Sequence, residues 1–130
     1  MSKTKEEIVA FRLLKSSKDL RAVKNLIASK DWDVAINRLY YAAFHAVSAL
    51  LYQHSIKAKA HAGAKAMLEL HFVKTGKLSV DWGKFYARLF DERNDSDYQD
   101  FVVYTADDVL PLLSQTEAFI DEIKRLIATK

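Results

Sequence analysis

A short polar stretch late in the chain, "DERNDSDYQD" (residues 91–100), carries side chains that suit an anionic ligand. Arg93 and Asp97 are four residues apart. Asn94 and Tyr98 repeat that spacing one position later, so all four side chains project from neighbouring parts of one helix end if the stretch is helical. A planar guanidinium suits phosphate, and a tyrosine hydroxyl donates or accepts a hydrogen bond. These four residues are therefore candidates for ligand binding, although a helix end held by an Arg93–Asp97 ion pair beside a solvated loop has the same spacing.

A second polar set occupies one face of a predicted helix in the first half of the chain. Arg38, Tyr41 and His45 are separated by three and then four residues and so share a helical face, with Asn37 and Ser48 beside them. A polar side chain on an otherwise apolar helix needs hydrogen-bond partners if it is buried. The set is therefore either part of a ligand site or a polar network in the core or at a dimer interface. Nothing in its spacing fixes a nucleophile or a base.

Other common site chemistries lack their residues in this sequence. The chain has no cysteine, which excludes disulfides, thiolate chemistry and cysteine-based zinc sites. His54, His61 and His71 do not have metal-ligand spacing with a third ligand nearby, so we expect no metal and no cofactor. The segment "HAGAK" has one glycine and no phosphate-loop pattern, and spacing indicates no Ser–His–Asp arrangement.

Composition favours one helical globular domain covering residues 1–130. Of the 130 residues, 50% are hydrophobic and 28% are charged, which argues against disorder. Three glycines and one proline leave few turn signals, and this favours long helices. The longest apolar run, residues 39–52, is too short to span a bilayer. Because the charged start of the chain also lacks a signal-peptide core, we expect a cytoplasmic protein without a membrane segment.

Basic residues give the chain a net charge of +3, which permits an anionic partner without requiring one. A denser basic segment is "KAKAHAGAK", which includes His61. Five basic residues of the first predicted helix step by three and so wind around it, which indicates a solvated surface: Arg12, Lys15, Lys18, Arg21 and Lys24.

Apolar residues at helical spacing predict five helical segments and an all-α fold, an antiparallel up-and-down bundle of four to five helices. The second segment is apolar on most of its sides, so we expect it to be buried in the bundle or at a subunit contact. Pro111 lies just inside the last segment, which therefore starts late or bends. The segments run from about Lys5 to Ser29, from a cap at Asp31 or Asp33 to Gln53, from His61 to Lys74, from a cap at Ser79 to Asp97, and from a capping box at Thr105 to Ala128.

Three phrases together resemble the small prokaryotic branch of the HEPN-domain family: "RLYYAAFHAVSALL", "HFVKTGKL" and "LFDERNDSDYQDF". The resemblance covers roughly Asp31 to the C-terminal helix. It implies an all-α up-and-down bundle that is commonly a homodimer. Many HEPN proteins are encoded beside a minimal nucleotidyltransferase and form toxin–antitoxin pairs with it, and several branches are metal-independent ribonucleases.

The ribonuclease signature of the family is an arginine followed, after four to six residues, by a histidine. Arg93 matches the arginine, but Tyr98, Gln99 and Asp100 stand where the histidine falls. Tyrosine does not exchange a proton near neutral pH as histidine does. The resemblance therefore implies a nucleotide- or RNA-binding protein acting with a nucleotidyltransferase, with Arg93 and Tyr98 as the candidate catalytic residues. The alternatives are a non-catalytic dimeric interaction module and a weak metal-independent ribonuclease.

Overall fold

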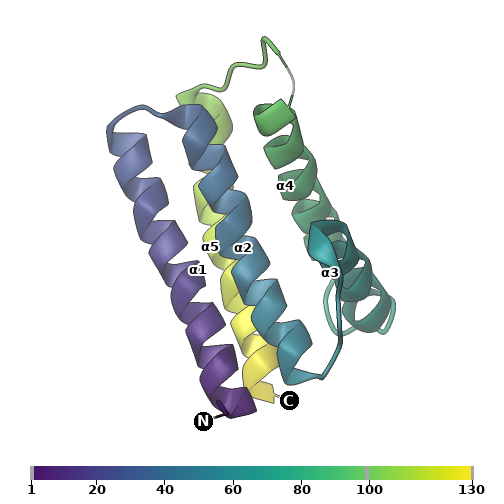
Figure 1. Cartoon of the computed structure of the whole chain (residues 1–130). Helices are drawn as coiled ribbons and strands as arrows, with labels where there is room; N and C mark the ends of the chain where they lie inside the picture. Colours follow the sequence, from purple (N-terminus) through teal and green to yellow (C-terminus); the bar gives the residue numbers. More distant parts are fainter. Residues whose placement is uncertain (1, 99, 130) are drawn as a thin grey trace.

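The computed structural model describes residues 2–98 and 100–129, and every regular element in those ranges is helical. Figure 1 shows α1, α2 and α5 side by side, with α3 and α4 on the other side of α2 and both termini at one end of the bundle. The predicted all-α bundle is therefore confirmed. The elements are α1 (Lys5–Ala28), α2 (Trp32–Gln53), α3 (Ala60–Leu68), a π-helical continuation (Glu69–Val73), α4 (Val80–Tyr98) and α5 (Ala106–Thr129).

Two of the predicted helix starts form through their side chains. The Ser79 hydroxyl accepts a hydrogen bond from the Trp82 amide at 3.2 Å and so caps α4. The Thr105 amide donates to Asp108 at 2.8 Å, which is the carboxylate half of the expected capping box before α5. Pro111 does not delay α5, which begins at Ala106 with the proline inside it. At the start of α2, by contrast, the Asp31 side chain makes no capping hydrogen bond.

The α2 helix is the centre of the core. Eleven of its residues are buried within a single chain, among them Ala42, Ala46 and Ala49, which form a flank of small side chains. That flank lets α1 approach closely enough for the Ser16 hydroxyl to donate to the Ala42 carbonyl at 2.7 Å. The apolar faces of α2 are thus covered by the chain's own helices. This coverage removes the reason for expecting the same apolar faces to form a subunit contact.

One side of α2 remains half-exposed along most of its length. We call this side the α2 strip. It spans about 22 Å at the rise of an α-helix, and every residue in it is neither fully buried nor fully exposed. The strip consists of Asn37, Arg38, Tyr41, Phe44, His45, Ser48 and Tyr52.

Candidate functional site

Arg93 joins α4 to the α2 strip. One terminal nitrogen donates to the Tyr41 hydroxyl at 3.0 Å and the other to the Asn94 side-chain oxygen at 2.8 Å. Its Nε lies 3.4 Å from Asp97 Oδ2, so the predicted Arg93–Asp97 pair is present. Arg93 is only 9% exposed, with its guanidinium carbon 5.2 Å from the centre of the Tyr40 ring. The sequence pattern placed this side chain at a polar helix end, whereas it is packed between α2 and α4.

Asp97 and Asn37 continue the network across the two helices. The Asn37 amide nitrogen lies 3.2 Å from each carboxylate oxygen of Asp97. The Asn37 oxygen in turn accepts two hydrogen bonds from Arg38, at 2.9 Å and 3.2 Å. The two sets predicted from separate parts of the sequence are therefore one continuous cluster in the folded chain.

Asp19 of α1 completes this cluster, and its role was not predicted from the sequence. One carboxylate oxygen lies 3.4 Å from Arg38 Nη1 and the other lies 2.8 Å from His45 Nδ1. The Asp19 side chain is 13% exposed, so both contacts are shielded from bulk water and weakly screened. We define the Arg93 cluster as Asp19, Asn37, Arg38, Tyr41, His45, Arg93, Asn94 and Asp97.

The Tyr41 ring contacts both arginines of the cluster. The guanidinium carbons of Arg38 and Arg93 lie 4.7 Å and 5.4 Å from the centre of its ring. Both distances fit cation–π contacts, which favour a cation held over an aromatic face. Two positive groups are thereby held near one ring on the half-exposed side of α2.

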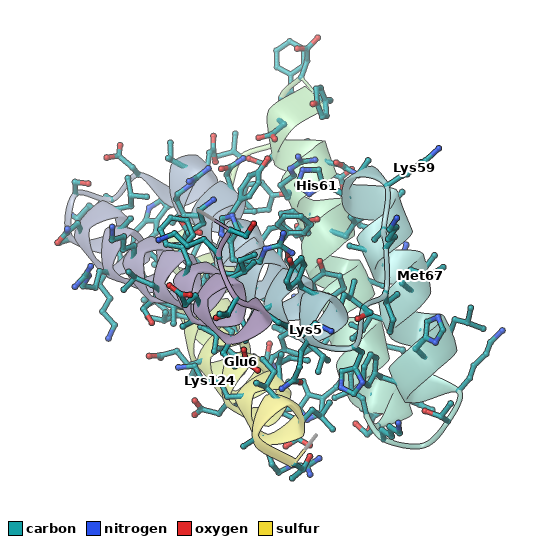
Figure 2. The ribbon with its side chains drawn as sticks, turned by 60° about the horizontal axis from the view of Figure 1, so that its bottom comes forward. Lys5, Glu6, Lys59, His61, Met67 and Lys124 are labelled. Carbon is teal, nitrogen blue, oxygen red and sulfur yellow. The ribbon has the colours of Figure 1, made fainter. Side chains whose placement is uncertain are left out.

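His61 also lies beside the cluster, although its spacing in the sequence gave no sign of this. Its Nδ1 is 2.9 Å from the Tyr40 hydroxyl, and its ring centre is 5.5 Å from that of Tyr41. Figure 2 shows His61 near the start of α3 on the side toward the other helices, whereas Lys59 points outward. Burial lowers the pKa of His61 below its ordinary value, and the nearby charges of Arg93 and His45 lower it further. A neutral imidazole is thus favoured beside the guanidinium of Arg93.

Arg93 is cationic, as arginine is in proteins at any physiological pH, and its surroundings favour that charge. Burial acts to lower the pKa of Arg93, but the Tyr41 hydroxyl and the charge of Asp97 outweigh it, and the net shift is upward. Burial likewise raises the pKa of the neighbouring Tyr40 to about 12. Near neutral pH the cationic Arg93 therefore lies beside the neutral Tyr40.

Tyr98 lies apart from the cluster. Its side chain is 77% exposed, and it makes no hydrogen bond or ring contact within residues 2–98 and 100–129. Of the residues predicted from the sequence, the structure therefore brings together Arg93, Asn94 and Asp97 with the α2 residues, but not Tyr98. Of the other two positions at which the family histidine falls, Gln99 is outside the described residues and Asp100 is exposed.

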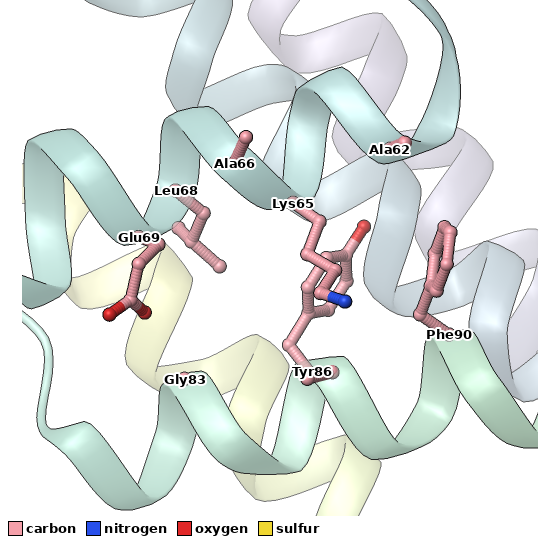
Figure 3. A pocket seen from close by; sticks show the side chains of 9 residues that line it. Ala62, Lys65, Ala66, Leu68, Glu69, Gly83, Tyr86 and Phe90 are labelled. Carbon is pink, nitrogen blue, oxygen red and sulfur yellow. The ribbon is translucent and has the colours of Figure 1, made fainter.

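A separate cavity of about 360 Å³ lies between α3 and α4. Figure 3 shows Lys65 and Glu69 reaching into it from the α3 side and Tyr86 and Phe90 from α4. It contains none of the residues predicted as a site. Across the described parts of the chain, no group of three histidine and carboxylate side chains is placed to hold a metal ion. Nor does any described helix have the length and hydropathy needed to cross a membrane.

The fold and the cluster define a small helical-bundle protein with an arginine-centred polar site. The chain belongs to the HEPN-domain family, whose model it matches over residues 9–126. It is 36% identical to a UPF0332 protein of Thermotoga maritima over 95% of this chain and 93% of that protein. It is 31% identical to the "Putative toxin MJ0605" of Methanocaldococcus jannaschii over 95% of this chain and 90% of that one. A second protein of that organism, "Putative toxin MJ0142", is 30% identical over 89% and 79% of the two chains.

Proposed function

We propose that this chain is a toxin-like HEPN protein that binds the phosphate of a nucleotide or RNA at the Arg93 cluster and acts with a nucleotidyltransferase. The observation that carries the proposal is the pair of guanidinium groups, Arg38 and Arg93, gathered around Tyr41 on the half-exposed side of α2. The relatives named as toxins and the family membership support the toxin-like class.

The hydrogen bonds of Arg93 are compatible with an exchange for phosphate. Its two terminal nitrogens donate to neutral acceptors, the Tyr41 hydroxyl and the Asn94 amide oxygen. A phosphate oxygen carries negative charge, and charge-assisted hydrogen bonds are roughly twice as strong as neutral ones. A phosphate that reaches Arg93 can therefore replace Asn94 or Tyr41 as acceptor. Asp97 stays 3.4 Å from Nε as an ion-pair partner, although Nε itself makes no hydrogen bond within the described residues.

The test is a titration of wild type and of Arg93 variants with labelled RNA and with a nucleoside triphosphate. We expect Arg93→Ala to lose binding by about ten- to a hundredfold, which corresponds to the roughly 1.5–3 kcal/mol of one charged hydrogen-bond donor. Because Arg93 is buried, Arg93→Lys is needed beside it: it retains the charge but loses the planar fork. Arg88→Ala is the matched control, since Arg88 is on the same helix with a 56% exposed side chain.

Thermal melting of the same variants separates a ligand site from a structural ion pair. If Arg93→Lys binds RNA and nucleotide as well as wild type but melts at a lower temperature, Arg93 serves the fold and the chain is a non-catalytic interaction module. Copurification with a nucleotidyltransferase encoded beside the gene tests the partner. A failure to associate with it would remove that half of the proposal.

We also propose that the protein is a homodimer, as its family membership suggests. The contact is expected to involve α2 and α4 at the end of the bundle where Asn37 meets Asp97, which leaves the rest of the α2 strip open. In a twofold-symmetric dimer the two Arg93 clusters can approach each other. Light scattering at micromolar concentration tests the state, and a monomer would contradict this proposal.

A second candidate function, metal-independent RNA cleavage, is favoured by the position of His61. The family histidine is absent after Arg93, but the His61 imidazole lies in ring contact with Tyr41, the tyrosine that Arg93 binds. In this mechanism His61 takes the proton of the 2′-hydroxyl, the 2′-oxygen attacks phosphorus, and the bond to the 5′-oxygen breaks. His45, whose ring is also in contact with that of Tyr41, would supply the proton to the leaving oxygen, while Arg93 stabilises the phosphorane.

Cleavage is tested with labelled RNA in the presence of a chelator. The mechanism predicts a 2′,3′-cyclic phosphate and a free 5′-hydroxyl, and it predicts that His61→Asn abolishes cleavage while lowering RNA affinity far less. Cleavage by wild type and His61→Asn at equal rates would exclude His61 as the base.

A further inference from the structure

A small cavity lies at the far end of the α2 strip from Asn37. Its volume is about 150 Å³, and its walls come from α1, α2, the following loop and α3. The polar residues in its lining are Arg12, Ser48, Tyr52 and His61, and the remaining lining residues, including Phe44 and Ala64, are apolar. The sequence pattern assigned Arg12 to a solvated surface, whereas the structure places it half-buried in this wall.

Arg12 is held in place without a carboxylate. Its Nη1 donates to the Ser48 hydroxyl at 2.9 Å and to the Ser48 carbonyl at 3.2 Å, and its guanidinium carbon lies 4.6 Å from the centre of the Tyr52 ring. Its Nε and Nη2 make no hydrogen bond within the described part of the chain. The other two arginines that are not exposed, Arg38 and Arg93, each lie beside an aspartate. Ser48 and Tyr52 thus hold the Arg12 guanidinium in position, while its Nε and Nη2 remain accessible and can donate to a ligand.

His61 forms a wall common to this cavity and to the Arg93 cluster. Its ring centre is 4.4 Å from that of Phe44, which also lines the cavity. Its Nδ1 is directed at Tyr40, whose ring the Arg93 guanidinium contacts. The His61 side chain would thus separate a ligand group in the cavity from the phosphate position proposed at Arg93.

The size of the cavity selects the ligand group. An engineered protein cavity of about 150 Å³ binds one benzene molecule, so this cavity fits one six-membered ring. Its lining combines aromatic side chains with hydrogen-bonding groups, as in sites that stack a base and contact its edge. We infer that the cavity is a subsite for one pyrimidine base of a single-stranded RNA, with Arg12 donating to a ring carbonyl. The fused rings of a purine exceed this volume, and because the cavity is open on one side a purine would protrude into solvent and bury a smaller part of its surface.

This inference rests on the proposed RNA-binding function. The α2 strip is the surface along which an RNA strand would run from the cavity to Arg93. Between the cavity and Arg93 the strip carries Phe44, His45 and Tyr41, so aromatic rings lie along its length with arginines at both ends. Single-stranded nucleic acids bind such alternations of stacking rings and cations. The basic loop residues Lys57 and Lys59 flank Ala58, which lines the cavity, and would lie near the RNA backbone.

The experiment compares binding of oligouridylate and oligoadenylate of equal length at one salt concentration. Wild type is expected to bind oligouridylate about tenfold more tightly. Arg12→Lys removes the planar set of donors, and Ser48→Ala removes the hydroxyl that holds the guanidinium in place. Both variants are expected to bind oligouridylate and oligoadenylate with similar affinity. Arg21→Lys, an exposed position on the same helix, is expected to leave the preference unchanged.

The outcomes separate this inference from the proposed function. Arg93→Lys could weaken the binding of both RNAs while wild type and Arg12→Lys show the same base preference. In that case the base subsite is wrong and the phosphate site stands. If wild type prefers oligoadenylate, the subsite is likewise wrong. If wild type binds neither RNA, both the inference and RNA binding at Arg93 are overturned.

Discussion

The Arg93 guanidinium donates a hydrogen bond to the Tyr41 hydroxyl at 3.0 Å and thereby links α4 to α2 through residues 52 positions apart in the sequence. The same tyrosine ring lies against Arg38, whose other contacts lead to Asp19 on α1. Three helices are thus joined around one aromatic side chain. Substitutions in this network should therefore affect both stability and ligand binding, and paired measurements can separate the two effects.

Tyr41→Phe should destabilise the protein by about 1–3 kcal/mol, because it leaves a buried guanidinium donor without its acceptor. The phenyl ring keeps the packing and the cation–π contacts, so the loss reports on the hydroxyl. Urea unfolding measures the change. Tyr52→Phe is the matched control: Tyr52 also packs under an arginine, but its hydroxyl makes no hydrogen bond within the described residues. Equal stability of the two variants would show that the Tyr41 hydroxyl contributes nothing.

Asp19 and Arg38 should be energetically coupled. Their charged groups are 3.4 Å apart, and Asp19 is largely shielded from water. A double-mutant cycle with Asp19→Asn and Arg38→Gln is expected to give a coupling energy of about 0.5–3 kcal/mol in unfolding experiments. The pair Arg88 and Glu92, 3.9 Å apart on the surface of α4, serves as comparison and should couple by less than about 0.5 kcal/mol. A coupling at Asp19 no larger than this would mean that its burial adds nothing to the interaction.

His61 should make stability depend on pH. Since its pKa is lower in the folded chain than in the unfolded one, the unfolded chain binds the proton more readily. Its contribution to stability is therefore fully present above the unfolded pKa of about 6.5 and decreases as the pH falls toward the folded pKa. Asparagine can accept from Tyr40 but does not titrate. The stability difference between wild type and His61→Asn should accordingly shrink from pH 8 to pH 5 in denaturant titrations, and a constant difference would contradict the shift.

Gly83→Ala should lower the melting temperature. A Cβ at this position would lie 3.0 Å from Val73 Cγ2 and 3.2 Å from a Glu69 carboxylate oxygen, so glycine lets α4 approach the π-helical segment. Alanine gains about 0.8–1 kcal/mol of helix propensity over glycine, but Val73 is buried and its branched side chain has little freedom to move. Circular dichroism melts provide the measurement. Ala87→Gly, in the same helix beside the α3–α4 cavity, is the control for helix propensity. A Gly83→Ala variant more stable than wild type would show that the Val73 side chain moves to make room for the new methyl group.

The helices were predictable because their signals are local. Apolar residues recur at helical spacing through each segment, and the Ser79 and Thr105 caps lie immediately before helices that form as predicted. The third segment was predicted as one helix, but its last residues, Glu69–Val73, form a π-helix. Residue spacing alone does not distinguish the two hydrogen-bond patterns.

The site was only partly predictable because its contacts are long-range. Spacing identified Arg38, Tyr41 and His45 as one set, and Arg93, Asn94 and Asp97 as another, but it gave no reason to join them. Asp19 stands in a helix rich in basic residues, where a lone acid is usually a surface charge, so nothing marked it as their common partner. The burial of Arg12 was missed for a related reason. A regular step of three gives the positions of residues around a helix, but it does not tell which of them other helices cover.

The position of α1 has a consequence for motion. This helix packs chiefly on α2 at the edge of the bundle, yet it supplies Asp19 to the cluster and Arg12 to the small cavity. Partial opening of a protein favours elements that bury few side chains, and α1 buries three of its residues against eleven in α2. Transient detachment of α1 would release Arg38 and His45 from their carboxylate and open the cavity, while the contacts of Arg93 with Tyr41 and Asn94 stayed in place. The amide hydrogens of α1 should therefore exchange with solvent earlier than those of α2, and RNA that bridges both helices should slow that exchange.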